Sequence, residues 1–427
     1  MIIFYHLFLI FYKAGIYLVS FGNKKAKLWI SGRKDIFQKL QKALESSASK
    51  KTIWMHCASL GEFEQGRPVL QRIKEDFADT IIVITFFSPS GFEIAKNNKD
   101  FKHVFYLPMD SKNAAKKWLE ILKPDLVLWV KYEYWHFYLK EISKRNIPLL
   151  MISGVYRSNK IFFKWYGGFY RDMLHCFTHF FLQNEDSKEQ LEKIISQERI
   201  TISGDTRCDR VIHIAENFTE VPGIKAFCGN HQVIVAGSTW EEDEAEWTHY
   251  VRQHPEIKFI IAPHEIDAEN LTDVQKSFTG SFFYSEWISD QRATTEYNFS
   301  SNGIQEPNCL IIDNIGMLSR LYQYATITYV GGGFGDDGLH NILEAAVYGK
   351  PVFFGPEHEK NFEANEMIEA GGAISISNAI ELEKTVNRLL NNETELLSRS
   401  EAAKKYVYKN AGATYKIISY IHEKKLL

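Results

Sequence analysis

A carboxylate stands in a glycine-bounded turn near the start of the chain, within the motif SLGEFEQG at residues 59–66. Gly61 and Gly66 allow a sharp turn, and Glu62 falls where a predicted strand ends and a helix begins. A carboxylate in that position can act as general base on an attacking hydroxyl group. The alternative is that Glu62 or Glu64 only caps the following helix, because acidic residues favour helix N-termini.

A second motif, GGGFGDDGLHNILE, occupies residues 331–344 and holds five glycines in its first eight positions. Glycines expose backbone N–H groups, and a helix that begins after them favours an anion, so we expect a phosphate to bind here. Glu344 could accept hydrogen bonds from a ribose. The spacing matches neither GxGxxG nor a Walker loop, which disfavours a dinucleotide-dependent dehydrogenase and an NTPase.

The motif AGST at residues 236–239 also follows a predicted strand. Ser238 or Thr239 can cap the next helix, and the N–H groups of its first turn can bind an anion. Pro263 and His264 end the following predicted strand, where His264 is either a structural hydrogen-bonding group or a ligand contact.

Two more charged residues follow predicted strands in the first half of the chain. Glu133 lies in YEYW and Arg207 in GDTRCD. An arginine can hold a leaving phosphate through two parallel hydrogen bonds. Either residue alone is more typical of a surface ion pair, but both fall at carboxyl ends of strands, as Glu62 does.

The elements that must position these residues alternate between β-branched or aromatic runs and helical stretches. This alternation predicts an α/β protein with parallel sheets covered by helices on both faces. The first strand series is expected at residues 52–59, 80–88, 103–108, 125–132, 148–154, 178–183 and 199–203. The second is expected at residues 232–238, 258–263, 281–287, 309–313, 326–331, 351–355 and 372–377.

The two series predict two doubly wound, Rossmann-like domains whose strand ends face a shared cleft, where we expect the active site. A less regular stretch with Pro222, Gly223 and Gly229 separates them. The expected division is an anchor at 1–22, a first Rossmann-like domain at 23–215, a second at 216–405, and a helix at 406–427 that packs back on the first domain.

Composition is that of a folded protein of 427 residues, with 45% hydrophobic and 24% charged residues. The net charge of −3 conceals an asymmetry, since residues 1–51 hold ten Lys or Arg and two acids. The absence of basic stripes along the domains excludes a general nucleic-acid binder. Positive charge beside an apolar terminus favours an anionic membrane surface as partner.

The cysteines are few and dispersed, and they form no CxxC pair. Neither a disulfide framework nor a zinc site is predicted, and the expected compartment is the reduced cytoplasm. We also expect no metal and no cofactor, and the sequence holds no Asp-x-Asp pair as a metal signature.

Residues 1–21 form an apolar segment long enough to cross a bilayer as a helix. His6, Lys13 and Ser20 are spaced by seven and would form one polar stripe, which favours a helix lying in the interface or packed on its own domain. A signal peptide would need positive charge before the apolar run. Membrane anchoring at the cytoplasmic face is expected, with spanning and interfacial modes both open.

Several of these motifs together resemble the Kdo transferases of lipid A biosynthesis, membrane-bound GT-B enzymes that add 3-deoxy-D-manno-octulosonic acid. The resemblance covers nearly the whole chain. Its residues are the basic-flanked apolar N-terminus, SLGE at 59–62, AGST at 236–239, HNILE at 340–344, GKPVFFGP at 349–356, and the segments at 361–362 and 369–373.

The resemblance implies that Glu62 is the general base and that Glu133 and Arg207 stabilise the transition state. It implies CMP contacts from Pro263, His264, Gly316, Met317, Leu318, Asn341, Ile342, Leu343 and Glu344. We expect Ser238, Thr239, Gly338 and His340 to complete the CMP-Kdo site. The sequence departs from the family pattern in reading KYEYWH for ETELWP, Arg207 for Lys, His264 for an Arg-His pair and Ile342 for Pro.

The expected reaction is a metal-independent, inverting transfer of Kdo from CMP-Kdo to lipid IVA at the cytoplasmic face of the cell inner membrane. The alternatives are a GT-B enzyme that uses a UDP-sugar, such as a peptidoglycan glycosyltransferase or a sugar 2-epimerase, and a non-catalytic membrane-anchored carbohydrate-binding protein. The sequence does not predict the number of Kdo residues added, the acyl pattern of the acceptor or the oligomeric state.

Overall fold

The computed structural model describes residues 1–45, 50–98, 100–131, 133–289, 307–335 and 338–427. Within these residues the chain forms two compact units, and each contains one parallel sheet of seven strands. Unit 1 comprises Met1–Asp209 and Ala411–Leu427, and unit 2 comprises Arg210–Asn410.

Unit 1 has the strand order β3-β2-β1-β4-β5-β6-β7. Its strands are β1 (Lys51–Cys57), β2 (Thr80–Phe86), β3 (His103–Tyr106), β4 (Leu126–Val130), β5 (Leu149–Gly154), β6 (His179–Leu182) and β7 (Ile200–Ile202). Its helices are α1 (Ile2–Val19), α2 (Lys24–Gly32), α3 (Ile36–Leu44), α4 (Leu60–Asp76), α5 (Pro89–Ala95), α6 (Lys112–Leu122), α7 (His136–Lys144), α8 (Gly168–Leu174), α9 (Glu185–Leu191), α20 (Ala413–Glu423) and the first residues of α10 (Thr206–Glu216). Short 3-10 turns lie at Ile161–Phe163 and Gln197–Arg199.

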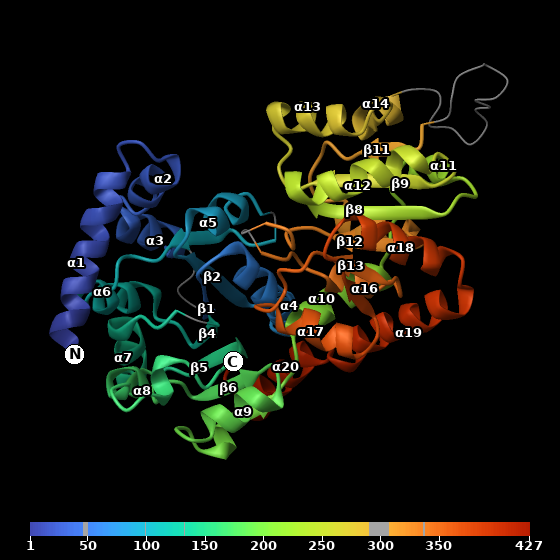
Figure 1. The fold of residues 1–427 in the computed structure, drawn as a ribbon. Helices are drawn as coiled ribbons and strands as arrows, with labels where there is room; N and C mark the ends of the chain where they lie inside the picture. Colours follow the sequence, from blue (N-terminus) through green and yellow to red (C-terminus); the bar gives the residue numbers. More distant parts are fainter. Residues whose placement is uncertain (46–49, 99, 132, 290–306, 336–337) are drawn as a thin grey trace. The chain divides into compact units, whose positions relative to one another are not determined.

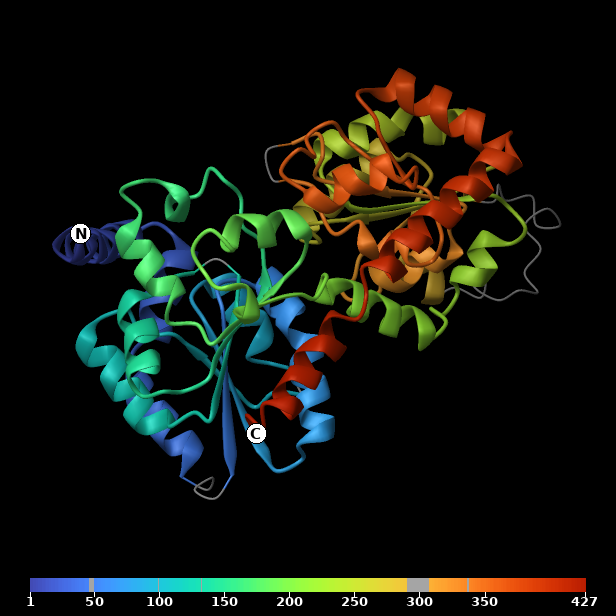
Figure 2. The same cartoon turned by 90° about the horizontal axis from the view of Figure 1, so that it is seen from below.

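Alternation along β1 builds two cores on the two faces of this sheet, because successive strand side chains point to opposite sides. Trp54 joins the core formed with α3, α6 and α7, whereas Ile53 and Met55 join the core formed with α4 and α20. Helix α20, red in Figure 2, therefore belongs to unit 1, where it packs on α4.

Unit 2 has the strand order β10-β11-β9-β8-β12-β13-β14. Its strands are β8 (Val233–Thr239), β9 (Lys258–Pro263), β10 (Phe282–Phe283), β11 (Cys309–Ile311), β12 (Ile327–Val330), β13 (Val352–Phe354) and β14 (Ala373–Ser375). Its helices are α11 (Ile224–Cys228), α12 (Glu241–Gln253), α13 (Ala268–Ser277), α14 (Tyr284–Ser289), α15 (Leu318–Leu321), α16 (Leu343–Ala346), α17 (Phe362–Glu369), α18 (Ala379–Leu390) and α19 (Glu393–Lys409), with a 3-10 turn at Tyr322–Tyr324.

Strand order reverses between β1 and β4 in unit 1, and between β8 and β12 in unit 2, where the paired strands are adjacent. Ligands of open parallel sheets bind beyond the carboxyl ends of strands at such a switch point. These two switch points are therefore the expected positions of functional side chains.

The expected α/β class with two doubly wound sheets is confirmed, and every predicted strand position holds a strand. The prediction for residues 281–287 is mostly wrong, since only Phe282–Phe283 is strand and α14 begins at Tyr284. The Glu286 carboxylate accepts a hydrogen bond from the Phe283 N–H at 3.2 Å, and Tyr284 and Trp287, three positions apart, are both buried. That spacing places both aromatic rings on one face of a helix.

Helix α1 lies along the edge of unit 1 beside α2 and α3 (Figure 1). It is long and apolar enough to cross a bilayer, with a mean hydropathy of 1.8, yet only 6% of it is buried. Tyr5 and Leu9 face unit 1, and the Tyr5 hydroxyl donates to Asp110 at 2.6 Å. The opposite face leaves large apolar side chains exposed, among them Phe4 and Phe11.

Candidate active site

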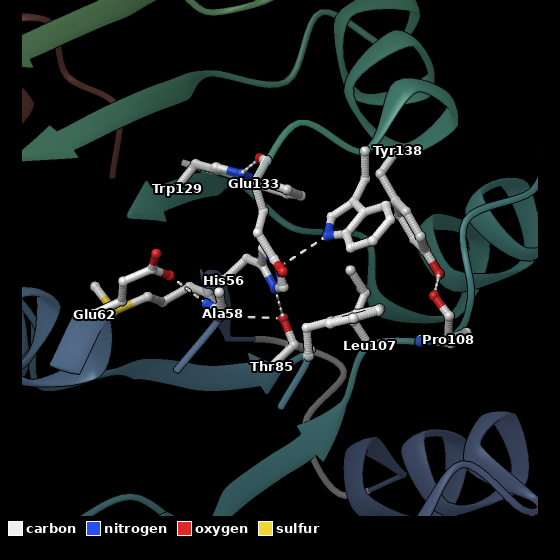
Figure 3. Close-up of polar contacts among 12 residues, drawn as sticks. His56, Ala58, Glu62, Thr85, Leu107, Pro108, Trp129, Glu133 and Tyr138 are labelled. Carbon is white, nitrogen blue, oxygen red and sulfur yellow. Dashed lines mark hydrogen bonds and ion pairs between the residues drawn. The ribbon is translucent and has the colours of Figure 1, made fainter. Parts of the chain in front are cut away.

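The turn after β1 places Glu62 at the carboxyl end of that strand. Ser59 is the N-cap of α4, and its hydroxyl accepts a hydrogen bond from the Glu62 N–H at 3.5 Å. The Glu62 carboxylate turns back and accepts from the Ala58 N–H (Figure 3). Glu62 is only 9% exposed. Ser59, and neither Glu62 nor Glu64, is therefore the N-cap of α4.

Glu133 follows β4, the strand beside β1, and is held by three ring nitrogens. Its Oε2 lies 2.9 Å from His56 Nε2 and accepts from Trp135 Nε1 at 3.0 Å, while its backbone carbonyl accepts from Trp129 Nε1 at 2.5 Å (Figure 3). The carboxylate keeps partial exposure, with 21% of the side chain accessible. Glu62 and Glu133 thus occupy neighbouring strand ends at the switch point of unit 1.

The motif analysis missed His56, which orients Glu133 from inside β1. His56 is fully buried, and its Nδ1 lies 2.9 Å from the hydroxyl of Thr85 on β2. The Thr85 hydroxyl accepts from Trp54 Nε1 at 2.8 Å, and its own proton has two acceptors in reach, His56 Nδ1 and Met55 O at 3.4 Å. Because an ionised carboxylate only accepts, His56 Nε2 is the donor to Glu133. A histidine among the apolar residues in the second half of β1 was the available signal.

Arg207 belongs to a segment that crosses back over the strand ends of unit 1. After β7, the Ser203 N–H donates to Leu182 O at the end of β6, and the Thr206 hydroxyl lies 3.0 Å from that of Ser153 at the end of β5. This path returns the chain toward β4. Arg207 therefore stands nearer the switch point than the position of β7 in the sheet would suggest.

The Arg207 guanidinium is fixed by Asp205, whose Oδ2 accepts from it at 2.7 and 3.0 Å. Burial alone would raise the pKa of Asp205, but Arg207 and Lys131 hold that pKa below its ordinary value. Lys131, directly after β4, and Ser153 both adopt left-handed backbone conformations, with φ of 53° and 56°. Strained backbone of this kind is concentrated at functional sites.

In unit 2, the turn after β8 differs from the predicted cap. Helix α12 has Trp240 as its N-cap, so the expectation that Ser238 or Thr239 would cap it is wrong. Ser238 takes a left-handed φ of 54°, and the Thr239 hydroxyl donates to Glu244 at 2.8 Å. Both residues are therefore diverted from capping by local geometry.

The buried carboxylate of Asp243 ties this turn to the glycine-rich turn after β12. It accepts from the Trp240 N–H at 2.9 Å, the Gly332 N–H at 2.8 Å and the Tyr329 hydroxyl at 2.5 Å. Burial raises the pKa of Asp243, and the three donors oppose that rise. Four acidic residues occupy the first turn of α12, so this helix N-terminus does not favour an anion.

The glycine-rich turn requires small residues because backbones meet there. A Cβ on Gly331 would lie 2.2 Å from Ser238 O, and one on Gly333 would lie 2.6 Å from Gly355 N. The turn leads into the short helix α16, with Ile342 as N-cap. The predicted motif also includes residues 336–337, which lie outside the described residues.

Three aromatic rings stack at the carboxyl end of the unit 2 sheet. The ring of His264 lies 4.6 Å from that of Trp240 and 4.4 Å from that of His340, with interplanar angles of 27° and 23°. The His264 N–H donates to Thr239 O at 2.9 Å, which aligns the end of β9 with that of β8. Trp240 is a second residue that the sequence interpretation did not assign to the site.

The remaining predicted donor contacts also follow strands of unit 2. Pro263 ends β9, while Gly316, with φ of 95°, and Met317, the N-cap of α15, follow β11. Asn341 accepts from the Leu343 N–H and donates to the carboxylate of Glu344, at 3.3 and 3.2 Å. Among the other predicted contacts, Gly338 has φ of 88°, and Leu318 begins α15.

No group of three or more His, Cys, Asp or Glu side chains that could hold a metal ion occurs in the described part of the chain. The expectation of a metal-independent reaction remains a prediction.

A pocket of about 430 Å³ adjoins Glu133 in unit 1. Glu133 and Trp135 line one part of it, and Met1, Phe4 and Phe8 of the N-terminal segment line another. The remaining lining side chains are aromatic: Tyr5, Tyr134, Phe169 and Tyr170. This largely aromatic pocket is therefore lined both by the exposed helix α1 and by the carboxylate at the switch point.

Comparison with known proteins gives a consistent family. Residues 34–210 match the family model described as 3-deoxy-D-manno-octulosonic-acid transferase (kdotransferase). The 3-deoxy-D-manno-octulosonic acid transferase of Rickettsia felis is 27% identical over 86% of this chain and 78% of that protein. The protein of the same name from Aquifex aeolicus is 24% identical over 81% of this chain and 88% of that protein.

Among solved structures, UDP-GlcNAc 2-epimerase from Neisseria meningitidis has a TM-score of 0.62 at 16% identity, and the match covers 87% of this chain and all of that chain. At this identity the likeness shows the fold alone, which is GT-B. The relatives match across both units, and the family model matches most of unit 1. The chain is therefore similar to Kdo transferases along most of its length, and its fold is that of GT-B glycosyltransferases.

Proposed function

We propose that this chain transfers Kdo from CMP-Kdo to the lipid A precursor lipid IVA, with inversion at the anomeric carbon and without a metal ion. The observation that carries the proposal is the pair of carboxylates, Glu62 and Glu133, on adjacent strand ends at the switch point of unit 1. The similarity to Kdo transferases supports Kdo as the transferred sugar.

Glu62 acts as general base in this mechanism. An acceptor hydroxyl oxygen attacks the anomeric carbon of Kdo, Glu62 takes the hydroxyl proton, and the bond to CMP breaks with its electron pair passing to the phosphate oxygen. The low exposure of Glu62 and the hydrogen bond from the Ala58 N–H support the role, since a general base must be held in place at the proton that it takes.

Glu133 and Arg207 stabilise the charges that develop during transfer. The hydrogen bonds from His56 and Trp135 hold the Glu133 carboxylate in one orientation, suited to a positive charge that builds at the anomeric carbon. Arg207, oriented by Asp205, presents a fixed cation for the departing phosphate. Both groups are set before substrate binds, so little reorganisation accompanies the reaction.

Unit 2 binds CMP-Kdo, and unit 1 binds the acceptor. On the donor side we assign the contacts to residues around the glycine-rich turn and the ends of β8, β9 and β11: Ser238, Thr239, Pro263, His264, Gly316, Met317, Leu318, Gly338, His340, Asn341, Ile342, Leu343 and Glu344. The close backbone approach at Gly331 and Gly333 supports binding through main-chain N–H groups.

The acceptor is a lipid that reaches the site from the cytoplasmic face of the inner membrane. Helix α1 and the basic residues that follow it, Lys24, Lys25 and Lys27, support attachment to an anionic bilayer surface. The apolar pocket between α1 and Glu133 suits an acyl chain of an acceptor whose sugar hydroxyl is presented to Glu62.

Mass spectrometry of the reaction product tests the proposal. The full chain in mild detergent is incubated with lipid IVA and either CMP-Kdo or UDP-N-acetylglucosamine, and free nucleotide is measured in parallel. We expect CMP release together with a product heavier by one or more Kdo residues, and no reaction with the UDP-sugar. Transfer from the UDP-sugar alone would overturn the donor assignment, and consumption of neither donor by a folded protein would overturn the transferase assignment.

A further inference from the structure

A second, larger groove lies along α1, with a volume of about 1020 Å³. It shares no lining residue with the pocket at Glu133. One wall is α1, and the other is formed by α2, α3 and the segment that leads into α6. Its size is at the upper end of the range of about 300–1,000 Å³ found for small-molecule sites.

Two lysines line this groove from opposite walls and have no partner among the described residues. Lys13 comes from α1, and Lys34 comes from the turn between α2 and α3. Neither ammonium group forms an ion pair or hydrogen bond with any residue in the described ranges. An anion bound in the groove would give both cations a partner.

The other charged side chains of the groove are already committed. Arg33 donates to three backbone carbonyls, Leu107 O and Phe87 O at 2.8 Å and Trp29 O at 3.0 Å, and burial lowers its pKa to about 9. Asp110 accepts from the Tyr5 hydroxyl and from the N–H groups of residues 137 and 138. Among the described residues, Lys13 and Lys34 are therefore the basic side chains of the lining that no protein group engages.

The rest of the lining is largely apolar and continues onto the exposed surface of α1. Ala14 and Leu18 line the groove from α1, and Ile30 and Phe37 line the opposite wall. Leu18 is 69% exposed. A ligand for this groove thus combines an anionic group with a long hydrocarbon chain.

We propose that this groove binds one anionic phospholipid, with its phosphate held by Lys13 and Lys34 and an acyl chain laid along α1. The inference rests on the membrane attachment proposed above and does not depend on sugar transfer. A soluble anion would leave the apolar walls in water, and a neutral lipid would leave the two ammonium groups without an opposing net charge.

Native mass spectrometry of the full chain in detergent tests the site, with phosphatidylglycerol and phosphatidylcholine as the added lipids. We expect one phosphatidylglycerol to remain bound, and phosphatidylcholine to bind at least about tenfold more weakly. The Lys13→Gln/Lys34→Gln variant should weaken phosphatidylglycerol binding at least about tenfold, the effect of losing one charge-assisted hydrogen bond.

The matched control is Lys24→Gln/Lys25→Gln, which removes the same charge from exposed positions of α2 that do not line the groove. It should leave the bound lipid within about twofold of the original affinity, since no groove contact is lost. An equal loss in both variants would show general charge attraction and overturn the proposal. So would equal binding of the two lipids.

A second variant, Ala14→Trp, fills the groove without changing charge. It should abolish retention of phosphatidylglycerol while leaving the melting temperature in lipid-free detergent within a few degrees. Lipid IVA transfer is measured alongside, so a chain that binds phosphatidylglycerol but transfers nothing refutes only the proposed function. Retention of the lipid by the folded tryptophan variant would show that the groove is not the site.

Discussion

The carboxyl ends of the two sheets differ in the kind of chemical group that they present. The carboxyl end of the unit 1 sheet presents ionisable side chains, Glu62 and Glu133, held by a buried chain of ring nitrogens and hydroxyls. The carboxyl end of the unit 2 sheet presents backbone groups. A Cβ added at Gly331 or Gly333 would clash with a neighbouring backbone atom, and the stacked rings of Trp240, His264 and His340 lie at the same end of the sheet. One topology therefore ends in ionisable side chains in unit 1 and in closely packed backbone in unit 2.

The difference follows from what occupies the switch point. In unit 1, His56 inside β1 lies within hydrogen-bonding distance of Glu133, which follows the end of β4 by three residues. In unit 2 the corresponding strands, β8 and β12, are linked through Asp243, which binds two main-chain N–H groups and a tyrosine hydroxyl. A carboxylate that is fully engaged in this way orders the turn and has no free role in chemistry.

The largest effect is expected at Glu62, at the carboxyl end of the unit 1 sheet. Glu62→Ala should lower the transfer rate by at least about 100-fold, because the attacking hydroxyl loses its base. The control Glu64→Gln changes the neighbouring acid of the same helix and should stay within about threefold of the original rate, as expected for a residue outside the reacting groups. Steady-state transfer to lipid IVA measures both, and near-original activity in Glu62→Ala would remove the proposed base.

The next largest effect is expected at Gly331, in the glycine-rich turn of unit 2. Gly331→Ala should weaken CMP binding about 30-fold and lower stability by about 1–3 kcal/mol, because its Cβ would meet Ser238 O at 2.2 Å. Gly335→Ala is the control, since the nearest atom to its Cβ lies at 3.5 Å. Calorimetric titration with CMP and thermal melting distinguish them, and equal behaviour of the two variants would show that close approach is unimportant.

A smaller effect is expected at the positioning residue of unit 1. His56→Gln should lower kcat about tenfold with little change in KM for CMP-Kdo, because Glu133 loses its orientation while the donor site in unit 2 stays intact. The kcat against KM split is the measurement. A rise in KM alone would place His56 in donor binding and contradict the assigned role.

The smallest effect concerns stability and pH. Burial raises the pKa of Glu244 to about 7, although its bond from Thr239 opposes the shift. The folded state thus holds a proton that the unfolded chain releases nearer pH 4.5, so stability falls as pH rises between about 4.5 and 7.

Glu244→Gln should remove most of this slope and stabilise unit 2 at pH 8 by on the order of 2 kcal/mol, relative to the original chain. Exposed Glu241 of the same helix is the control, and Glu241→Gln should leave the slope in place. Melting temperatures recorded from pH 5 to pH 8 compare the three proteins. An unchanged slope in Glu244→Gln would assign the pH dependence elsewhere.

The strands were predictable from sequence because each is a short apolar run with turn residues on both sides. The adjacency of β1 and β4 was not, since it depends on the order of strands in the sheet. For the same reason, the role of His56 in orienting Glu133 could not be predicted from its place in a strand. Its partners Thr85 and Glu133 are 29 and 77 positions away in the chain.

The cap of α12 shows a different limit. Sequence rules favour serine and threonine as N-caps, and both precede this helix. Ser238 instead takes a left-handed conformation beside the glycine-rich turn, and Thr239 bonds to Glu244. Local geometry that the residue types do not specify therefore decided the cap, and Trp240 occupies it.

Helix α20 has a consequence for how the molecule is made. Its Ile417 and Ile421 complete the core between the unit 1 sheet and α4, yet they are synthesised only after all of unit 2. The hydrogen bonds of Asp209 also require this segment, since its carboxylate accepts from the N–H groups of Gly412 and Thr414 at 2.5 and 2.6 Å. On the ribosome, unit 2 can therefore mature while unit 1 still lacks one wall, and a nascent chain cut before residue 411 would expose that apolar face to chaperones and proteases.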